Sequence, residues 1–221
     1  NIIKYCTDHN ARLIHISTLS VSGNGMEGKN SVQTLEKNIE FTEDDLYIGQ
    51  KLSNIYSYTK YLAELSVLEN IIEKNLKATI IRVGNLMGRS YDGKFQKNKS
   101  ENAFVDRIRF IIENKIIPKN IVENDYFEIS PVDLTAKGIL KISNLEKSNV
   151  IYHLFNYNYY SVSDFIEYLK NKNINIKIVR PEEFYKKLKD MLKKSNFSNN
   201  AILSDLNTDN QIEYSTKIKI N

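Results

Sequence analysis

The sequence predicts an α/β protein built around a parallel β-sheet. Predicted strands and helices alternate along most of the chain, a pattern typical of strand–helix–strand units whose neighbouring strands run parallel. In addition, Ala78–Val83 contains the continuous run Thr-Ile-Ile-Arg-Val, which is typical of a parallel strand buried on both faces. In a sheet of this kind the active site lies beyond the carboxyl ends of the strands.

The first part of the chain is predicted to contain a helix end, a strand and a long helix. Residues 1–9 have the pattern of the end of a helix, and Arg12–Ser17 forms the first strand. A long loop continues to about Lys51. The helix that follows, over residues 52–75, carries apolar side chains at helical spacing, namely Leu62, Leu65, Leu68, Ile71 and Ile72.

The second part is predicted to continue the alternation. Helices are predicted over 104–114, 133–142, 163–170 and from 181, and strands over 126–132, 150–155 and 174–179. Asp133, and either Ser161 or Ser163, are the predicted N-caps, because short polar side chains accept hydrogen bonds from first-turn amides. Pro181 occupies the favoured first turn of its helix. Residues 195–221 form a polar, asparagine-rich tail.

Composition excludes several classes of protein. The longest apolar runs, such as Ile108–Ile112, are interrupted by charge and are too short to span a bilayer. The single cysteine, Cys6, excludes an internal disulfide framework, and the three scattered histidines give no metal-ligand spacing. The net charge of +4 comes from dispersed lysines, without the interleaved arginines and aromatics of a nucleic-acid surface. We therefore expect a soluble, cytoplasmic protein without metal, membrane or nucleic-acid partners.

A tyrosine and a lysine four positions apart define the candidate catalytic site. Tyr56 and Lys60 lie on one face of the predicted helix, where the lysine ammonium favours the phenolate and makes the phenol a usable proton donor and acceptor. Thr18, which follows the first strand, can hydrogen-bond an oxygen that gains charge. With 14 tyrosines in the chain the pair alone is weak evidence. The order strand, Ser-Thr, loop, Tyr-x-x-x-Lys, helix and strand is much harder to obtain by chance.

Several segments together carry a family resemblance. They are His15–Gly23, Ile48–Gln50, Asn54–Glu64, Ile81–Arg89, Asp92–Gln96 and Ile129–Asp133. Over roughly residues 1–190 the chain resembles the extended short-chain dehydrogenases/reductases. Within that superfamily it is similar to the thioester reductase domains of nonribosomal peptide synthetases and to carboxylic acid reductases. The segments Ile48–Gln50 and Asp92–Gln96 point to the peptide-synthetase branch.

The resemblance implies a partial Rossmann-like, doubly wound parallel sheet with a smaller C-terminal α/β cap. Residues 1–88 would form the C-terminal half of an NADP-binding domain and carry the catalytic residues. Residues 89–221 would form mainly the substrate and cap region, with 126–155 returning to the main sheet and 195–221 as a polar tail. The chain is expected to lack the glycine-rich turn that opens such reductases.

The resemblance also implies a reaction, namely the NADPH-dependent reductive release of an acyl or peptidyl thioester as an aldehyde. The thioester would be bound through phosphopantetheine to a carrier protein domain, and a second reduction to the alcohol stays open. Tyr56 would donate the proton, Lys60 would assist it and bind the nicotinamide ribose, and Thr18 would hold the oxyanion. The nicotinamide end of the cofactor would be lined by Val83, Gly84 and Asn85.

The pattern Gly-x-Gly-x-x-Gly at Gly23–Gly28 is interpreted as an active-site loop and not as a phosphate cradle. A dinucleotide fingerprint requires a following strand that ends in an acidic residue about 20 positions further on. Here Lys29–Gln33 leads into a polar, acidic stretch. Structural roles are likewise predicted for Arg82 and Arg89, in ion pairs or helix caps, and for His15, beside the first strand.

Two alternative functions stay open at this stage. An extended-type epimerase or dehydratase acting on a nucleotide sugar would share the Thr18, Tyr56 and Lys60 arrangement, although Asp92–Gln96 and Ile48–Gln50 argue against it. Alternatively, the chain is a non-catalytic fragment that retains only a carrier-docking role.

Overall fold

The computed structural model describes residues 2–23, 26, 39–52, 54–97, 102–124, 126–145, 150–194 and 219–220. The chain divides into two compact units. The first unit comprises Asn1–Leu86, Val132–Phe155 and Tyr214–Asn221, and the second comprises Met87–Pro131 and Asn156–Glu213. No helix in the described part of the chain has both the length and the apolar character needed to cross a membrane.

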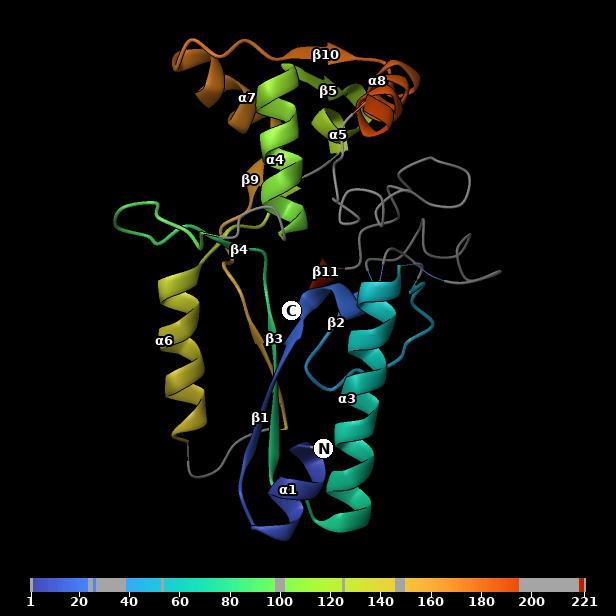
Figure 1. Ribbon diagram of the computed structural model, residues 1–221, viewed down its shortest axis with the longest axis vertical. Coiled ribbons are helices and arrows are strands. Elements are labelled where there is room, and N and C mark those ends of the chain that lie inside the picture. The colour runs from blue at the N-terminus through green and yellow to red at the C-terminus, as the bar shows by residue number, and fades with distance from the viewer. Residues whose placement is uncertain are drawn as a thin grey trace. The chain divides into compact units, whose positions relative to one another are not determined.

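The first unit is built on a three-stranded parallel sheet in the order β1–β3–β8 (Figure 1). Its strands are β1 (Leu13–Thr18), β3 (Ala78–Val83) and β8 (Ile151–Leu154). In the register of the sheet Thr18 lies beside Val83, and Val83 lies beside Leu154, so the three strands end together. The predicted parallel α/β architecture is confirmed, and the strand at Ala78–Val83 has the predicted bounds.

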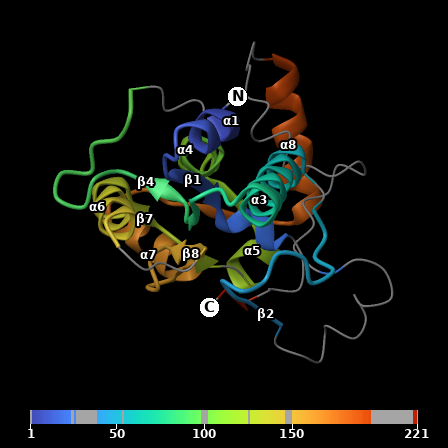
Figure 2. The same cartoon turned by 90° about the horizontal axis from the view of Figure 1, so that it is seen from below.

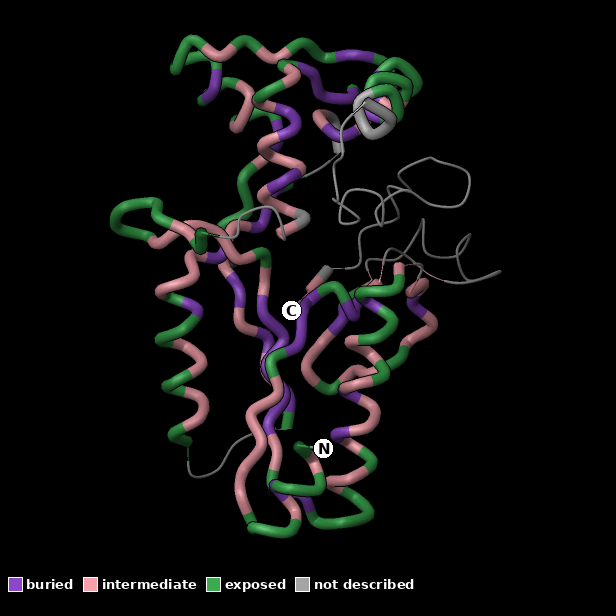
Figure 3. The backbone as a smooth tube through the Cα atoms, in the orientation of Figure 1, coloured by how far each residue is buried: buried purple, intermediate pink, exposed green. Residues whose placement is uncertain are grey.

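Helices flank this sheet on two sides, as in a doubly wound fold. Helix α3 (Ile55–Lys74) and helix α6 (Val132–Ser143) lie on opposite sides of the strands in both views (Figures 1 and 2). The buried positions follow the strands between them (Figure 3). One apolar cluster, which includes a residue of helix α1 (Ile2–Asp8), consists of Cys6, Val67, Leu76, Ile80 and Ile151. Gly138 lets α6 approach β8 closely, since a Cβ there would lie 2.7 Å from Leu154 Cδ1.

The loop expected between β1 and α3 contains additional structure. A 3₁₀-helix, η1 (Leu19–Ser22), follows β1 directly, and strand β2 (Glu40–Phe41) pairs in parallel with β11 (Lys219–Ile220). The predicted tail at 195–221 therefore includes a short strand, while its other residues lie outside the described part of the chain. Helix α3 begins at Ile55, later than expected, because Asn54 is its N-cap and accepts a 2.7 Å hydrogen bond from the Ser57 amide.

The remaining elements belong to the second unit or to its boundary with the first. They are β4 (Leu86–Met87), α4 (Ala103–Asn114), β5 (Ile116–Pro118), α5 (Lys119–Asn124), β6 (Tyr126–Phe127), β7 (Ser130–Pro131), β9 (Tyr160–Ser161), α7 (Val162–Asn171), β10 (Lys177–Val179) and α8 (Pro181–Lys194). In the second unit β5 pairs in parallel with β10, and β6 pairs antiparallel with β9. Its apolar cluster consists of Phe110, Ile116, Val179, Phe184 and Leu188.

The expected strand over 126–132 is wrong, because it is two separate strands, β6 and β7. Between them the Ile129 carbonyl accepts a 2.9 Å hydrogen bond from the Asn156 side chain, and the Glu128 carboxylate accepts one of 3.1 Å from the Asn156 amide. These side-chain contacts take the place of strand pairing.

The predicted helix caps have mixed outcomes. Asp133 is not an N-cap, because α6 already begins at Val132 and Asp133 lies in its first turn. There the negative charge of the carboxylate interacts favourably with the helix dipole. Ser161 is confirmed as the N-cap of α7, since its hydroxyl accepts a 3.0 Å hydrogen bond from the Asp164 amide.

Candidate active site

The carboxyl edge of the three-stranded sheet brings together Thr18, Val83 and Gly84. Thr18 and Val83 are adjacent in register at the ends of β1 and β3, and both are buried. The Gly84 amide donates a 3.1 Å hydrogen bond to the Leu154 carbonyl, which fixes the turn after β3. Asn85, the next residue, is exposed. These positions follow from the shared direction of the strands, as expected from the sequence.

The Thr18 side chain is the N-cap of η1. Its Oγ1 atom accepts a hydrogen bond from the Ser20 amide and donates one to Ser20 Oγ, each with a length of 3.2 Å. Because η1 starts directly after β1, this cap holds the hydroxyl at the end of the strand. The Ser20 side chain is exposed. The Thr18 hydroxyl can therefore donate its hydrogen bond to another acceptor, because the Ser20 hydroxyl that loses this bond is not buried.

Tyr56 and Lys60 lie in the first two turns of α3. The Lys60 Nζ atom is 6.0 Å from the centroid of the Tyr56 ring and donates a 3.1 Å hydrogen bond to the Ile16 carbonyl of β1. Lys60 thus reaches the strand two residues before Thr18. The Tyr56 side chain is 53% exposed, and within the described part of the chain its hydroxyl has no hydrogen-bond partner.

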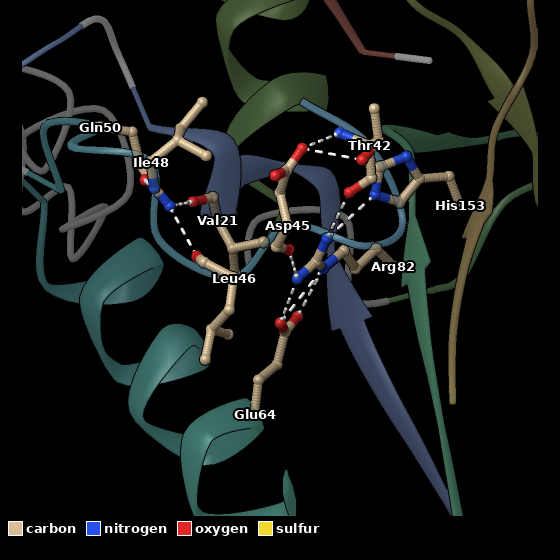
Figure 4. A network of polar contacts seen from close by, with 9 residues as sticks. All are labelled: Val21, Thr42, Asp45, Leu46, Ile48, Gln50, Glu64, Arg82 and His153. Atoms are coloured by element: carbon tan, nitrogen blue, oxygen red, sulfur yellow. Dashed lines mark hydrogen bonds and ion pairs between the residues drawn. The ribbon is translucent and has the colours of Figure 1, made fainter. Parts of the chain in front are cut away.

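Gln50 organises the segment that leads into α3. It is fully buried, and its side-chain amide donates to the Val21 carbonyl of η1 at 3.0 Å and to the Leu46 carbonyl at 2.9 Å. Its Oε1 atom accepts a 2.7 Å hydrogen bond from the Ile48 amide (Figure 4). The motif Ile48–Gln50, which the sequence marked without a role, therefore ties η1 to the approach of α3.

Gly23, at the end of η1, packs directly against the same segment. Its φ angle is +74°, and a Cβ atom there would lie only 2.6 Å from the Lys51 carbonyl oxygen and 3.0 Å from the Gln50 side chain. In Gly23–Gly28 the first glycine thus serves a close backbone contact after a 3₁₀-helix. Apart from Gly23 and Met26, that pattern lies outside the described residues.

Arg82 is the centre of a buried polar network (Figure 4). Its Nε atom lies 3.1 Å from both carboxylate oxygens of Glu64, and one Nη atom lies 2.8 Å from Glu64 Oε2. The remaining contacts are to the Asp45 carbonyl at 2.8 Å, the Thr42 carbonyl at 3.3 Å and His153 Nε2 at 3.1 Å. Because an arginine only donates, His153 Nε2 must act as an acceptor. The structural role predicted for Arg82 is confirmed.

Sequence reasoning missed Glu64 as the partner of Arg82, although a signal was present. An arginine inside an apolar strand run needs a buried acceptor. Glu64 is spaced four and eight residues from Lys60 and Tyr56, so it shares their helix face.

In the second unit, Arg89 forms an ion pair of 2.6 Å with Asp92, as predicted.

His15 lies on β1, as expected, with one polar atom unsatisfied. Its Nε2 atom is buried and has no hydrogen-bond partner in the described part of the chain. Burial lowers the pKa of His15 below its ordinary value of 6.5, the nearby Lys60 charge lowers this pKa further, and Glu64 opposes both effects. His15 is therefore neutral at neutral pH and lies within electrostatic reach of both α3 charges.

Comparison with known proteins gives one family and several similar structures. The family described as Male sterility protein, which is NAD-binding, matches residues 1–139. No curated protein sequence matches the chain. A thiolation-reductase di-domain from an archaeal nonribosomal peptide synthetase is 32% identical, with a TM-score of 0.72 over 98% of this chain and 44% of that chain. The reductase domain of the aureusimine biosynthetic cluster is 26% identical, with a TM-score of 0.72 over 100% of this chain and 54% of that chain.

A more distant structure shares only the fold. UDP-glucuronic acid 4-epimerase from Bacillus cereus, in complex with NAD, is 19% identical, with a TM-score of 0.58 over 81% of this chain and 52% of that chain. The chain thus spans about half the length of each of these structures. Since the family match covers more than half of the 221 residues, the chain belongs to the NAD-binding Male sterility family of extended short-chain dehydrogenases/reductases.

Proposed function

We propose that the protein containing this chain is an NADPH-dependent thioester reductase. It releases an acyl or peptidyl group from a carrier protein domain as an aldehyde. The observation that supports this proposal most is the contact of Lys60 with both the Ile16 carbonyl of β1, two residues before Thr18, and the Tyr56 ring, in a chain 32% identical to a peptide-synthetase reductase. Residues 1–88 supply the catalytic part, and residues 89–221 supply mainly the substrate region, in a cytoplasmic enzyme.

The residues present fit the nicotinamide end of the proposed cofactor. Among the described residues the Lys60 ammonium makes one hydrogen bond, to the Ile16 carbonyl, and it retains further donors for ribose hydroxyls. Gly84 has no side chain to block a planar ring, and the apolar residue Val83 precedes it at the end of β3. Asn85 lies exposed directly after them. The cofactor, when bound there, supplies a hydride to the carbonyl carbon of the thioester.

As the carbonyl oxygen gains negative charge, the Tyr56 hydroxyl is the proton donor. Its side chain is half-exposed and its hydroxyl is not engaged within the described part of the chain, so it can meet the substrate directly. The Lys60 ammonium, 6.0 Å from the ring centroid, stabilises the phenolate that remains after proton transfer. The resulting thiohemiacetal then collapses and releases the thiol and the aldehyde.

Thr18 stabilises the same oxygen as a hydrogen-bond donor. To do so, its hydroxyl proton rotates away from Ser20 Oγ, while Oγ1 keeps accepting from the Ser20 amide. The backbone contact therefore holds the oxygen atom in place during this exchange. One such donor contributes roughly 3 kcal/mol to stabilising a developing oxyanion.

The test uses the full-length protein with NADPH and an acyl phosphopantetheine thioester. We expect NADPH absorbance to fall and aldehyde to form. The Tyr56→Phe variant should lose turnover while its NADPH affinity stays within a few-fold, because the ring still packs and only the hydroxyl is lost. Tyr58→Phe is the matched control, since Tyr58 is exposed on the same helix and should be dispensable.

Two outcomes would contradict the proposal. Conversion of a UDP-sugar without thioester reduction would favour the epimerase or dehydratase alternative. Carrier-protein binding without any NADPH binding would favour a docking role alone.

A further inference from the structure

Helix α3 carries an acidic side chain one turn beyond the catalytic lysine. Tyr56, Lys60 and Glu64 follow each other at four-residue spacing and so share one face of the helix. Opposite charges at this spacing are close enough to pair with one another. Lys60 instead hydrogen-bonds the Ile16 carbonyl and lies beside the Tyr56 ring.

Arg82 explains why Lys60 and Glu64 do not pair. It contacts both Glu64 oxygens, at 3.1 Å, 3.1 Å and 2.8 Å, and both side chains are 0% exposed. The other guanidinium contacts, to the Asp45 carbonyl, the Thr42 carbonyl and His153, give each guanidinium nitrogen an acceptor. The guanidinium is thus anchored on several elements and cannot follow Glu64 elsewhere.

We propose that Arg82 is a positioning residue that keeps Glu64 away from Lys60 and so leaves the lysine ammonium directed to Tyr56. This role rests on the function proposed above. Without Arg82, Glu64 would be a buried carboxylate with its main partner removed, a state that is strongly unfavourable. Lys60, one helical turn away, is the cation that Glu64 would recruit. Pairing with Glu64 would draw the ammonium along the helix, away from the phenol.

The shifted pKa of His15 indicates that the charges of Lys60 and Glu64 lie close to each other. The charges of Lys60 and Glu64 both act on this one imidazole, in opposite directions, after the larger effect of burial. All three side chains therefore lie within electrostatic reach of one another.

The experiment compares Arg82→Met with the double variant Arg82→Met/Glu64→Gln in the full-length protein. Arg82→Met should lower kcat for thioester reduction by roughly 10-fold or more, a part of the 10²–10⁴-fold that a positioned proton donor contributes. The double variant has no carboxylate to recruit Lys60 and should recover most of that loss. A double variant as slow as Arg82→Met would overturn the proposal, because the loss of kcat would then not depend on the Glu64 carboxylate.

Two further variants guard against misfolding and unrelated effects. Glu64→Gln alone keeps an amide acceptor for Arg82 and should keep kcat within a few-fold of the wild type. A larger loss in a folded Glu64→Gln protein would contradict the proposal. Arg12→Met is the matched control, because Arg12 binds the Ser143 carbonyl and Thr79 Oγ1. It should lower the melting temperature without changing kcat.

A readout independent of activity separates this inference from the proposed function. In a crystal structure of Arg82→Met, the Lys60 Nζ atom should lie on the Glu64 carboxylate and no longer on the Ile16 carbonyl. An unmoved Lys60 would refute the positioning role even in an active enzyme. A moved Lys60 would support it even if the wild-type protein reduced no thioester.

Discussion

At the scale of single residues, the polar side chains around the sheet edge fall into two groups. Gln50, Glu64 and Arg82 are fully buried, and their polar groups are satisfied by fixed partners. Thr18 and Tyr56 instead have an exchangeable partner or none in the described part of the chain. The fixed group rigidifies the site, and the exchangeable group can meet a substrate.

Thr18 gives a direct test of this division. Thr18→Ser keeps the hydroxyl and should retain most activity, whereas Thr18→Val keeps the shape and should lose roughly 10²-fold or more in kcat. Steady-state kinetics of both variants in the full-length protein provide the measurement. Equal activities would mean that the hydroxyl serves only to cap η1.

His15 gives a prediction for the pH dependence of stability. Its pKa is lowered in the folded protein, chiefly by burial, so the unfolded chain binds the proton more readily. Its contribution to stability is therefore fully present above the ordinary value of 6.5 and is lost as the pH falls below it. The melting temperature of His15→Phe should accordingly fall less than that of the wild type between about pH 7 and pH 5. The same substitution at the exposed His9 is the control, and an unchanged slope for His15→Phe would refute this assignment.

At the scale of elements, the sequence predicted those whose signal is local. The strand at Ala78–Val83 contains the run Thr-Ile-Ile-Arg-Val, which is typical of a buried parallel strand, and it has the expected bounds. Strand β2 could not be predicted, because its partner β11 comes from residues 219–220 and pairing over that distance leaves no local pattern. Likewise, β5 and α5 are too short to show a period.

The contact between η1 and the approach to α3 yields a stability prediction. Gly23→Ala combines a φ of +74° with a Cβ only 2.6 Å from the Lys51 carbonyl, so we expect a loss of about 2 kcal/mol or more in the free energy of unfolding. Gly93→Ala is the matched comparison, since its φ is +66° but nothing lies within 4 Å. Strain alone should cost it about 1 kcal/mol. Urea unfolding measures both, and equal losses would show that the Lys51 contact adds nothing.

At the scale of the whole molecule, the candidate site draws on residues far apart in the sequence. Residues 18, 56, 60 and 83 belong to a single compact unit, which the chain leaves after Leu86 and re-enters at Val132. Strand direction predicted an active site beyond the carboxyl ends of the strands, and in the register of the sheet Thr18 and Val83 lie side by side at that edge. The sequence signals a buried acceptor for Arg82, but the choice of Glu64 also depends on the rotation of α3 against β3.

The order of elements around Gly23–Gly28 also indicates whether these glycines can hold the cofactor phosphates. In a dinucleotide fingerprint the glycine-rich turn joins a strand directly to an α-helix, whose N-terminus holds the pyrophosphate. Here β1 leads into the 3₁₀-helix η1, and Gly23 is used for the contact with Gln50 and Lys51. We therefore expect Gly25→Ala to leave NADPH affinity unchanged in the full-length protein.

Lys60→Ala provides the contrast, because the proposed contact of its ammonium with the ribose would be lost. It should weaken NADPH binding and slow turnover together, whereas Gly25→Ala should alter neither. Calorimetric titration of NADPH into both variants and the wild type makes the comparison. Loss of affinity in Gly25→Ala with normal affinity in Lys60→Ala would show that Gly23–Gly28 holds the phosphates. In that case the nicotinamide would have to be placed elsewhere than beside α3.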